Sequence, residues 1–346
     1  MSPVGVSGQS VSDLLTVIIT TSPTPSAPST ELISAILSSF REHCASLLSC
    51  RMIVVFDTYD RIAAHARLKK GQVTADGART YDQYKQNVRE AILNEFNRDY
   101  REENLVGGQG QAEFGHSAVE TNIVPFSTLQ TADEQLTFIE PTKRLGFGLA
   151  IRSALRLATT PFVWVQQHDW PLVSDITLEP LLDIMRISES DENVPVKYIC
   201  LPSVRLLSYA DSAHVTHFPV LRELTASLKR DFVAESGVSV PLTPMFFWHD
   251  KPHLASTEHY LSRVFPTRLS MSRGAFIEDT IGQRSRNQMK LGNWTKWATW
   301  LYYPDNGEKL CLRHLQGRTW QGAEKELQMK AIWMARNTQQ INQIEK

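Results

Sequence analysis

Residues 14–20, LLTVIIT, form a short and almost continuous apolar run, and residues 52–56, MIVVF, form a second one. Runs of this length are typical of strands that are buried on both faces of a parallel sheet. Residues 20–30 are rich in Ser, Thr and Pro, which predicts a loop, and apolar residues at 32–40 recur at helical spacing, with Ser29 or Thr30 as N-cap. Strand, loop, helix and strand within about 45 residues predict a βαβ unit with a right-handed crossover.

The same alternation returns later in the chain. Residues 136–139 and 162–165 are expected to form strands, with a helix at 149–158 between them. The stretch from 61 to 135 is long for a simple connection, so we expect an insertion that covers one side of a site. Within it we expect an exposed helix from 81 to about 103, followed by a Gly-rich loop at 107–110.

The domain organisation follows from the absence of internal repeats and clear linkers. We expect a flexible N-terminal tail at 1–12, one α/β domain with insertions at 13–318, and a C-terminal helix at 319–346. Beyond residue 175 the expected elements are helices at 178–187 and, in part, 275–289, and strands at 198–201, 242–248, 299–303 and 310–315.

Composition limits the classes of partner. Lys and Arg total 36 and Asp and Glu total 37, so the formal net charge is −1, which provides no general field for nucleic acid or an anionic membrane. The four cysteines contain no CxxC pair, which favours free thiols in a reducing compartment. No run approaches the ~18–20 apolar residues of a membrane span, and the first residues do not resemble a signal peptide. We therefore expect a cytoplasmic protein with no membrane span and no nucleic-acid partner.

Three predicted strand ends carry polar side chains, at residues 20–22, at Asp57 and at residues 167–169. In open α/β sheets, ligands bind outside the carboxyl ends of the strands. A carboxylate such as Asp169 in that place suits a hard cation such as Mg²⁺ or Mn²⁺. The alternative role for Asp169 is to cap the turn before Pro171.

The order of these pieces resembles the nucleotide-sugar-dependent glycosyltransferases of the GT-A fold, in particular the large inverting family 2. The resemblance covers about residues 14–318 and implies a Rossmann-like mixed sheet flanked by helices, with the acceptor side at about 175–318. The nucleotide site that it implies comprises Thr20, Thr21, Ser22, Asp57, Lys143, Arg144 and His168, with Asp60 as the alternative to Asp57 for contact with the base.

The metal motif Asp-x-Asp of that family resembles Gln167, His168 and Asp169 here. Gln replaces the first acid, and the final Asp, which usually contacts the metal, is present. His314, in CLRHLQGRTW, resembles the C-terminal histidine that often completes the metal shell. The resemblance thus implies Mn²⁺ or Mg²⁺ at Asp169 and His314; the alternative for His314 is a histidine satisfied within a strand.

The segment FIED at 276–279 resembles the acidic motif whose carboxylate removes the proton of the acceptor hydroxyl. The resemblance implies Asp279 as catalytic base, with Glu278 beside it, and transfer with inversion to a glycan or other hydroxyl acceptor. The alternative is a solvated helix start, where acids favour the helix dipole.

Three histidines lie close together in the segment 248–260 and raise the question of a zinc site. Pro252 disfavours the helix that would bring two of them onto one face, and no HExxH motif is present. We instead expect a polar loop at the acceptor site, with Trp248, His253 and Trp170 contacting a sugar.

Two rival functions remain open. A sugar-nucleotide pyrophosphorylase normally has a Gly-rich, basic loop after the first strand, and residues 20–30 contain neither Gly nor a basic residue. A non-catalytic nucleotide- or glycan-binding relative is favoured by Gln167 in place of an acid. A turnover assay distinguishes the latter from a transferase.

Overall fold

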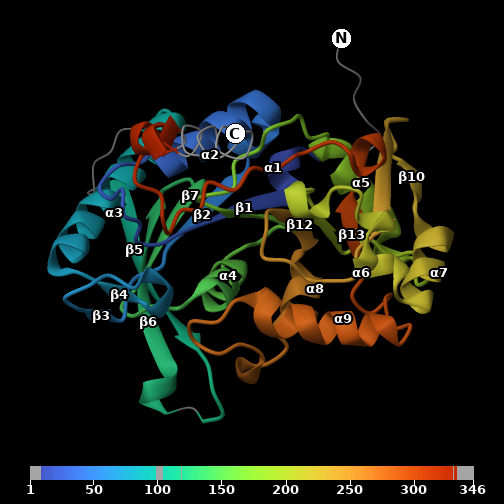
Figure 1. The fold of residues 1–346 in the computed structure, drawn as a ribbon. Coiled ribbons are helices and arrows are strands. Elements are labelled where there is room, and N and C mark those ends of the chain that lie inside the picture. Colours follow the sequence, from blue (N-terminus) through green and yellow to red (C-terminus); the bar gives the residue numbers. More distant parts are fainter. Residues whose placement is uncertain (1–8, 99–103, 118, 330, 333–346) are drawn as a thin grey trace, which may run out of the picture.

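The computed structural model describes residues 9–98, 104–117, 119–329 and 331–332. An eleven-stranded mixed sheet runs through the molecule (Figure 1). Its strands, in order across the sheet, are β10 (Arg230–Val233), β11 (Ser239–Pro244), β13 (Thr299–Tyr302), β9 (Tyr198–Cys200), β12 (His253–Ser256), β8 (Phe162–Gln167), β1 (Leu15–Thr21), β2 (Arg51–Phe56), β7 (Leu136–Pro141), β6 (Ile123–Thr131) and β5 (Leu105–Glu113). A small separate sheet pairs β3 (Arg61–Ile62) with β4 (Gln72–Val73).

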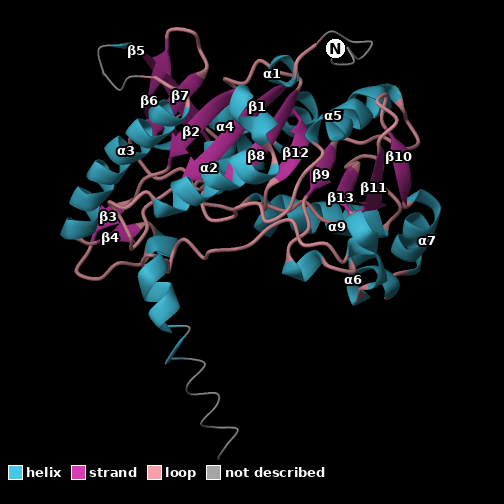
Figure 2. Cartoon of the chain, turned by 90° about the horizontal axis from the view of Figure 1, so that it is seen from above, coloured by secondary structure: helices cyan, strands magenta, loops and turns pink. Residues whose placement is uncertain are grey.

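Helices flank the large sheet (Figure 1, Figure 2). They are α1 (Val11–Leu14), α2 (Glu31–His43), α3 (Ala75–Glu95), α4 (Phe147–Leu155), α5 (Leu178–Ile187), α6 (Ala213–Thr216), α7 (Pro219–Leu228), α8 (Thr257–His259) and α9 (Gln283–Lys290). Helix α2 lies on one face of the sheet, and α4 and α9 lie on the other (Figure 1). The predicted α/β class with a mixed sheet flanked by helices is confirmed.

The centre of the sheet is parallel, as the apolar runs predicted. Strand β1 pairs in parallel with β2 on one side and with β8 on the other. Every residue of β1 is buried, because helices cover both faces of a parallel sheet. Thr30 is the N-cap of α2, one of the two residues expected there.

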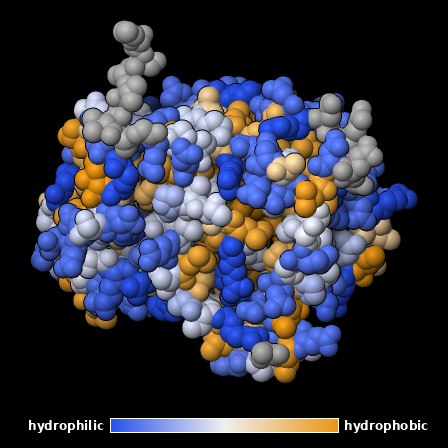
Figure 3. All heavy atoms as spheres, turned by 180° about the vertical axis from the view of Figure 1, so that it is seen from behind, coloured by the Kyte–Doolittle hydropathy of each residue, from blue (hydrophilic) through white to orange (hydrophobic). Residues whose placement is uncertain are grey.

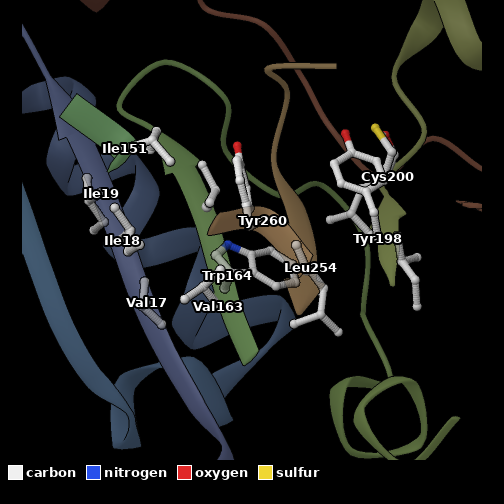
Figure 4. Close-up of a cluster of buried hydrophobic side chains, with 14 of the residues drawn as sticks. Val17, Ile18, Ile19, Ile151, Val163, Trp164, Tyr198, Cys200, Leu254 and Tyr260 are labelled. Atoms are coloured by element: carbon white, nitrogen blue, oxygen red, sulfur yellow. The ribbon is translucent and has the colours of Figure 1, made fainter. Parts of the chain in front are cut away.

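The core is continuous across the centre of the sheet. Figure 4 shows side chains of β1, β8, β9 and β12 gathered around the fully buried Trp164. The indole Nε1 of Trp164 donates to Oε1 of Gln166 at 3.2 Å, so the ring is buried with its polar atom satisfied. All four cysteines are buried and free, in agreement with the prediction of free thiols.

The predicted polar loop at 248–260 is wrong in part, because residues 253–256 form β12. This strand pairs antiparallel with both β8 and β9, in the register His253↔Val165 and His253↔Cys200. Four residues are too few for a periodic pattern, so the strand depends on pairing with partners distant in sequence.

The insertion also differs from expectation. The predicted Gly-rich loop at 107–110 lies within β5, which pairs antiparallel with β6. A Cβ on Gly110 would lie 2.3 Å from the ring of Phe126, and one on Gly108 would lie 2.5 Å from Oγ1 of Thr128, so side chains of β6 cover two of the three glycines of β5. Helix α3 begins at Ala75, earlier than predicted, where the side chain of Thr74 caps it by accepting from the N–H of Gly77.

The C-terminal region contains a second correction. The predicted strand at 310–315 is absent from the described chain, where Leu312 makes only isolated bridges to Leu172 and Ser203. Of the predicted helix at 319–346, residues 323–329 and 331–332 are helical, residues 319–322 are not, and residues 330 and 333–346 lie outside the described residues. Most of the predicted tail, residues 1–8, lies outside the described residues. Within the described chain, no helix combines the length and the apolar character needed to cross a bilayer.

The surface has the character usual for a globular protein. The face shown in Figure 3 is largely hydrophilic, with apolar side chains scattered among the polar ones.

Candidate active site

A pocket of about 710 Å³ opens at the carboxyl ends of β1, β2 and β8. Residues from all three predicted strand ends line it, namely 20–22, Asp57 and 167–169. The acidic pair Glu278 and Asp279 lines the same pocket, although more than 100 residues separate it from β8. The three strand ends lie together because the carboxyl ends of parallel strands meet at one edge of the sheet.

Asp169 lies at the centre of this edge and is only 8% exposed. Its Oδ2 lies 3.1 Å from Nε2 of His314 and accepts a hydrogen bond of 2.8 Å from the N–H of Gly317. Burial acts to raise the pKa of Asp169, but His314, His168 and the Gly317 N–H outweigh it, so the pKa lies below its usual value. The carboxylate is therefore ionised at neutral pH.

The ring of Trp170 orients His314. The two rings stack with centroids 4.2 Å apart and planes 6° apart. This contact fixes the plane of the imidazole, while Nε2 points at Asp169. The structure thus brings together two of the predicted site residues that are 145 positions apart in sequence.

The donor set of this pair is one carboxylate and one imidazole. Oδ1 of Asp169 has no hydrogen-bond partner among the described residues, so it is available to a ligand. No cluster of three or more His, Cys, Asp or Glu side chains suitable for a metal ion occurs in the described chain. A Mg²⁺ or Mn²⁺ ion at Asp169 and His314 would fit as an ion that takes its other ligands from phosphate oxygens and water.

His168 joins the ends of β1 and β8. Its Nδ1 lies 2.8 Å from Oγ1 of Thr21 and accepts a hydrogen bond of 3.3 Å from the N–H of Ser22, which places the hydrogen of the neutral ring on Nε2. Burial lowers the pKa of His168 and keeps the ring neutral. Thr21 also lies 2.7 Å from the hydroxyl of Tyr84 in α3, so the strand ends are tied to the insertion.

Asp57 is engaged by the backbone. Its Oδ1 accepts from the N–H of Leu145 at 2.6 Å, and its Oδ2 accepts from the N–H of Gly146 at 3.0 Å. Burial raises the pKa of Asp57 to about 6 against these hydrogen bonds. The predicted contact with a base is therefore in competition with a structural role, because both oxygens hold the loop that begins α4.

Arg144 and Lys143, which were also predicted on the nucleotide side, lie in different places. Arg144 lines the pocket, with Nη1 3.7 Å from Oδ2 of Asp60, and Asp60 also pairs with Arg273. Lys143 is exposed and does not line the pocket, because the chain turns it toward solvent just before the buried Leu145. We therefore leave Lys143 out of the site.

Two glycines allow the two sides of the pocket to touch. A Cβ on Gly146 would lie 2.4 Å from the Cα of Gly274, and the N–H of Gly274 donates to the carbonyl of Leu145 at 2.6 Å. Both glycines have positive φ, 78° and 81°, which other residues rarely adopt. The loop held by Asp57 thus contacts the loop that leads to Asp279.

The predicted acidic pair begins the segment Glu278–Gly282, a π-helical turn that continues into α9. Oε2 of Glu278 lies 3.6 Å from Nδ1 of His249, and this contact lowers the pKa of Glu278. The carboxylate of Asp279 is exposed and has no hydrogen-bond or ion-pair partner among the described residues. Of the two acids, Asp279 is the one free to act on a ligand.

Trp248 and His253 do not lie where the sequence prediction placed them. Both are fully buried and neither lines the pocket, because β12 carries His253 into the sheet. Nδ1 of His253 lies 2.6 Å from the carbonyl of Lys251, and burial lowers the pKa of this histidine to about 3. They are therefore corrected from acceptor contacts to core residues, and Trp170 alone of the three predicted aromatic contacts lines the pocket.

Several lining residues were not predicted. They include Ser203, Arg205, Asp250, Lys251 and Arg318. Asp250 is 3% exposed, and burial raises its pKa well above the usual value. Its carbonyl accepts from Nε2 of Gln167 at 2.7 Å, so Gln167 joins the metal-motif strand to this loop. No local sequence pattern indicates Asp250 and Lys251, because the antiparallel pairing of β12 brings them to the site. Arg318 follows Gly317 in the segment that contacts Asp169.

Neither a protein-family model nor a curated protein matches the chain. The matching solved structures include glycosyltransferases. TarS residues 1–349 from S. aureus match at 12% identity and a TM-score of 0.41, over 86% of this chain and 59% of that one. The mannosyltransferase PcManGT from Pyrobaculum calidifontis, solved with GDP-Man and Mn²⁺, matches at 13% and 0.38, over 85% and 58%.

A UDP-glucose pyrophosphorylase complexed with UDP-glucose also matches, at 12% identity and a TM-score of 0.32, over 79% of this chain and 88% of that one. This chain thus spans about 59% of the TarS fragment. Because these TM-scores are low, the function is inferred below from the residues of the site itself.

Proposed function

We propose that the protein transfers a sugar from a nucleoside-diphosphate sugar to a hydroxyl group of an acceptor. The observation that carries the proposal is the contact between Asp169 and His314 in a pocket that also exposes Asp279. An ionised carboxylate with an adjacent imidazole suits a divalent cation, and a free carboxylate suits a base. In transfer from a diphosphate sugar, the cation stabilises the departing diphosphate and the base takes the proton of the acceptor hydroxyl.

The donor side of the proposal uses Asp169, His314 and the cationic side chains of the pocket. A Mn²⁺ or Mg²⁺ ion held by the pair would supply Lewis-acid stabilisation of the charge on the departing diphosphate. The guanidinium groups of Arg144 and Arg318 line the same pocket and add to that stabilisation. Residues 20–22 at the end of β1 complete the nucleotide side, as the family resemblance implies.

The acceptor side of the proposal uses Asp279 as the general base. An acceptor hydroxyl is a poor nucleophile at neutral pH until a positioned carboxylate takes its proton. Glu278 is held by His249, so Asp279 is the acid with both oxygens available. A single base implies one in-line displacement, with inversion at the sugar carbon.

The test is a thermal-shift panel of UDP, GDP, CDP and dTDP, each with and without Mn²⁺, followed by a turnover assay with the nucleotide sugars that bind. A diphosphate at about 100 times its Kd should raise the free energy of unfolding by ~2.7 kcal/mol. The expected result is a shift for at least one diphosphate that grows with Mn²⁺. No response to any of them would overturn the proposal.

The second candidate is a non-catalytic nucleotide- or glycan-binding relative. Gln167 favours it, because the position of the first acid holds an amide that donates to the carbonyl of Asp250. Metal-dependent diphosphate binding without turnover of donor, alone or with acceptors, would select this candidate over the transferase.

A further inference from the structure

The pocket contains polar side chains that the proposed reaction does not use. They come from residues 201–205, which follow β9, and residues 250–252, which precede β12. The two segments lie side by side, because β9 pairs with β12 and the N–H of Leu201 donates to the carbonyl of Pro252 at 3.3 Å. Arg205 and Lys251 thus line the same part of the pocket.

These two cations lack acidic partners. No Asp or Glu side chain of the described residues lies within 4.0 Å of the Lys251 ammonium or the Arg205 guanidinium. Burial lowers the pKa of Lys251, and the nearby Arg205 acts in the same direction, while Cys200 and Glu278 act against it. Two like charges that face a half-enclosed pocket favour an anion between them.

A buried hydroxyl belongs to the same segment as Arg205. Ser203 is 3% exposed, it lines the pocket, and its Oγ has no hydrogen-bond partner in the described chain. A buried hydroxyl is normally hydrogen-bonded, so one that lines a pocket without a partner points to a ligand. Oγ of Ser203 can donate to an oxyanion.

Three acidic groups lie near these cations. Oε2 of Glu278 lies 3.6 Å from Nδ1 of His249, and its charge acts to raise the pKa of Lys251 without forming an ion pair with it. Asp250 is buried, and burial raises the pKa of its carboxyl well above the usual value. Asp279 is exposed, and its charge acts against the burial that lowers the pKa of Arg318. Among the described residues none of these acids forms an ion pair with Arg205 or Lys251, so both cations remain available to a ligand.

We propose that Ser203, Arg205 and Lys251 form an anion subsite that binds a phosphate or carboxylate group of the acceptor. The proposal rests on the proposed function, in which the pair of Asp169 and His314 serves the donor diphosphate. Lys251 Nζ lies 6.0 Å from the ring centroid of Trp170, and Trp170 stacks on His314, so the subsite adjoins the place of sugar transfer. Val204, between Ser203 and Arg205, is 69% exposed and also lines the pocket, so the subsite is open to solvent on that side.

The oxyanion that binds at this subsite belongs either to the acceptor or to the donor diphosphate. The experiment below distinguishes these two sources, because the donor site is filled with a diphosphate before phosphate is added. Inorganic phosphate is titrated by calorimetry into the protein saturated with Mn²⁺ and the diphosphate that gives the largest thermal shift. Ionic strength is kept constant with chloride, because exposed charges are screened by salt. The variants are Arg205→Gln, Lys251→Gln and Ser203→Ala, with Lys296→Gln as control, an exposed lysine outside the pocket.

Phosphate is expected to bind the diphosphate-loaded parent. Arg205→Gln and Lys251→Gln should each raise its Kd about tenfold, with a smaller rise for Ser203→Ala and none for Lys296→Gln. The Kd of the diphosphate should be unchanged in all of them. Because Arg205 is exposed, its variant tests the subsite even if Lys251→Gln is poorly folded.

Three outcomes would overturn the subsite. They are no binding of phosphate to the loaded parent, equal binding to parent and variants, and a rise in the Kd of the diphosphate that matches the rise for phosphate. The last would assign Arg205 and Lys251 to the donor. If no diphosphate binds but phosphate binding is still lost in the variants, the proposed function fails and the anion subsite stands.

Discussion

The N–H of Gly317 donates a hydrogen bond of 2.8 Å to Oδ2 of Asp169, the same oxygen that lies 3.1 Å from Nε2 of His314. One carboxylate oxygen is thus occupied by the C-terminal segment, and the other is left for a ligand. The chain after His314 therefore supports the pocket directly.

Asp169→Asn is expected to abolish metal-dependent diphosphate binding and to leave the fold intact. The amide oxygen can still accept from Gly317, but the side chain has lost the charge that a divalent cation requires. Calorimetry of UDP or GDP binding with and without Mn²⁺ checks this, and equal metal-dependent affinity in variant and parent would exclude Asp169 as a ligand.

His314→Ala should weaken metal-dependent binding less than Asp169→Asn does, because one ligand of the pair remains. The cost in stability should be small, since the side chain of His314 is 44% exposed. His217→Ala, at an exposed histidine outside the pocket, is the matched control. Unchanged manganese dependence of diphosphate binding in His314→Ala would remove this residue from the metal site.

Asp279→Asn should retain diphosphate affinity and lower turnover by ~10²–10⁴-fold, the usual contribution of a general base. The pH–rate profile should lose its acidic limb with the same change. Glu278→Gln, which alters the neighbouring acid held by His249, is the comparison. Loss of donor binding, with turnover kept at saturating donor, would make Asp279 a binding residue.

Gly317→Ala should weaken metal-dependent diphosphate binding, although the substitution removes no charged group. The added Cβ would lie 2.5 Å from Nε2 of His168 and 3.1 Å from Cβ of Asp169, so the segment after His314 must move away. A loss of about 1–3 kcal/mol in the free energy of unfolding is expected from such overpacking. Gly107→Ala, where the new Cβ meets no atom within 4 Å, is the control, and the two should differ in both thermal and binding measurements.

The raised pKa of Asp57 predicts that the free energy of unfolding depends on pH. Its pKa is raised from 3.8 to about 6 in the folded protein, so the folded state holds a proton that the unfolded state releases. The stabilisation from this proton is present below about pH 4 and is lost as pH rises toward 6. The difference in free energy of unfolding between parent and Asp57→Asn, measured by urea denaturation from pH 4 to 7, should change in that window. A difference independent of pH would contradict the prediction.

The fold was predictable where strands are long, apolar and buried on both faces. β1, β2, β7 and β8 have this character, and each was expected near its observed bounds. Strands β5 and β12 were missed for opposite reasons. The three glycines of β5 favour a loop in the sequence, although the ring of Phe126 in β6 covers Gly110 in the structure. Strand β12 is too short for any pattern.

The candidate site was predictable only in part. Asp169 follows a buried strand, so its place at the sheet edge follows from sequence, but its contact with His314 was implied only by the family resemblance. Lys251 and Ser203 could not be found, because the pairing of β12 with β8 and β9 is non-local. Trp248 and His253 were placed in the site for their chemistry, whereas the sheet buries them.

The contact between Gly146 and Gly274 couples the loop fixed by Asp57 to the loop that continues to Asp279. A Cβ on Gly146 would meet backbone atoms of Gly274, which cannot move aside without moving their loop. A Cβ on Gly274 would instead lie 2.8 Å from Nη1 of Arg144, whose Nη2 donates to the carbonyl of Gly274 at 3.4 Å. A larger residue at position 146 would therefore separate the donor side of the pocket from the loop that carries Asp279.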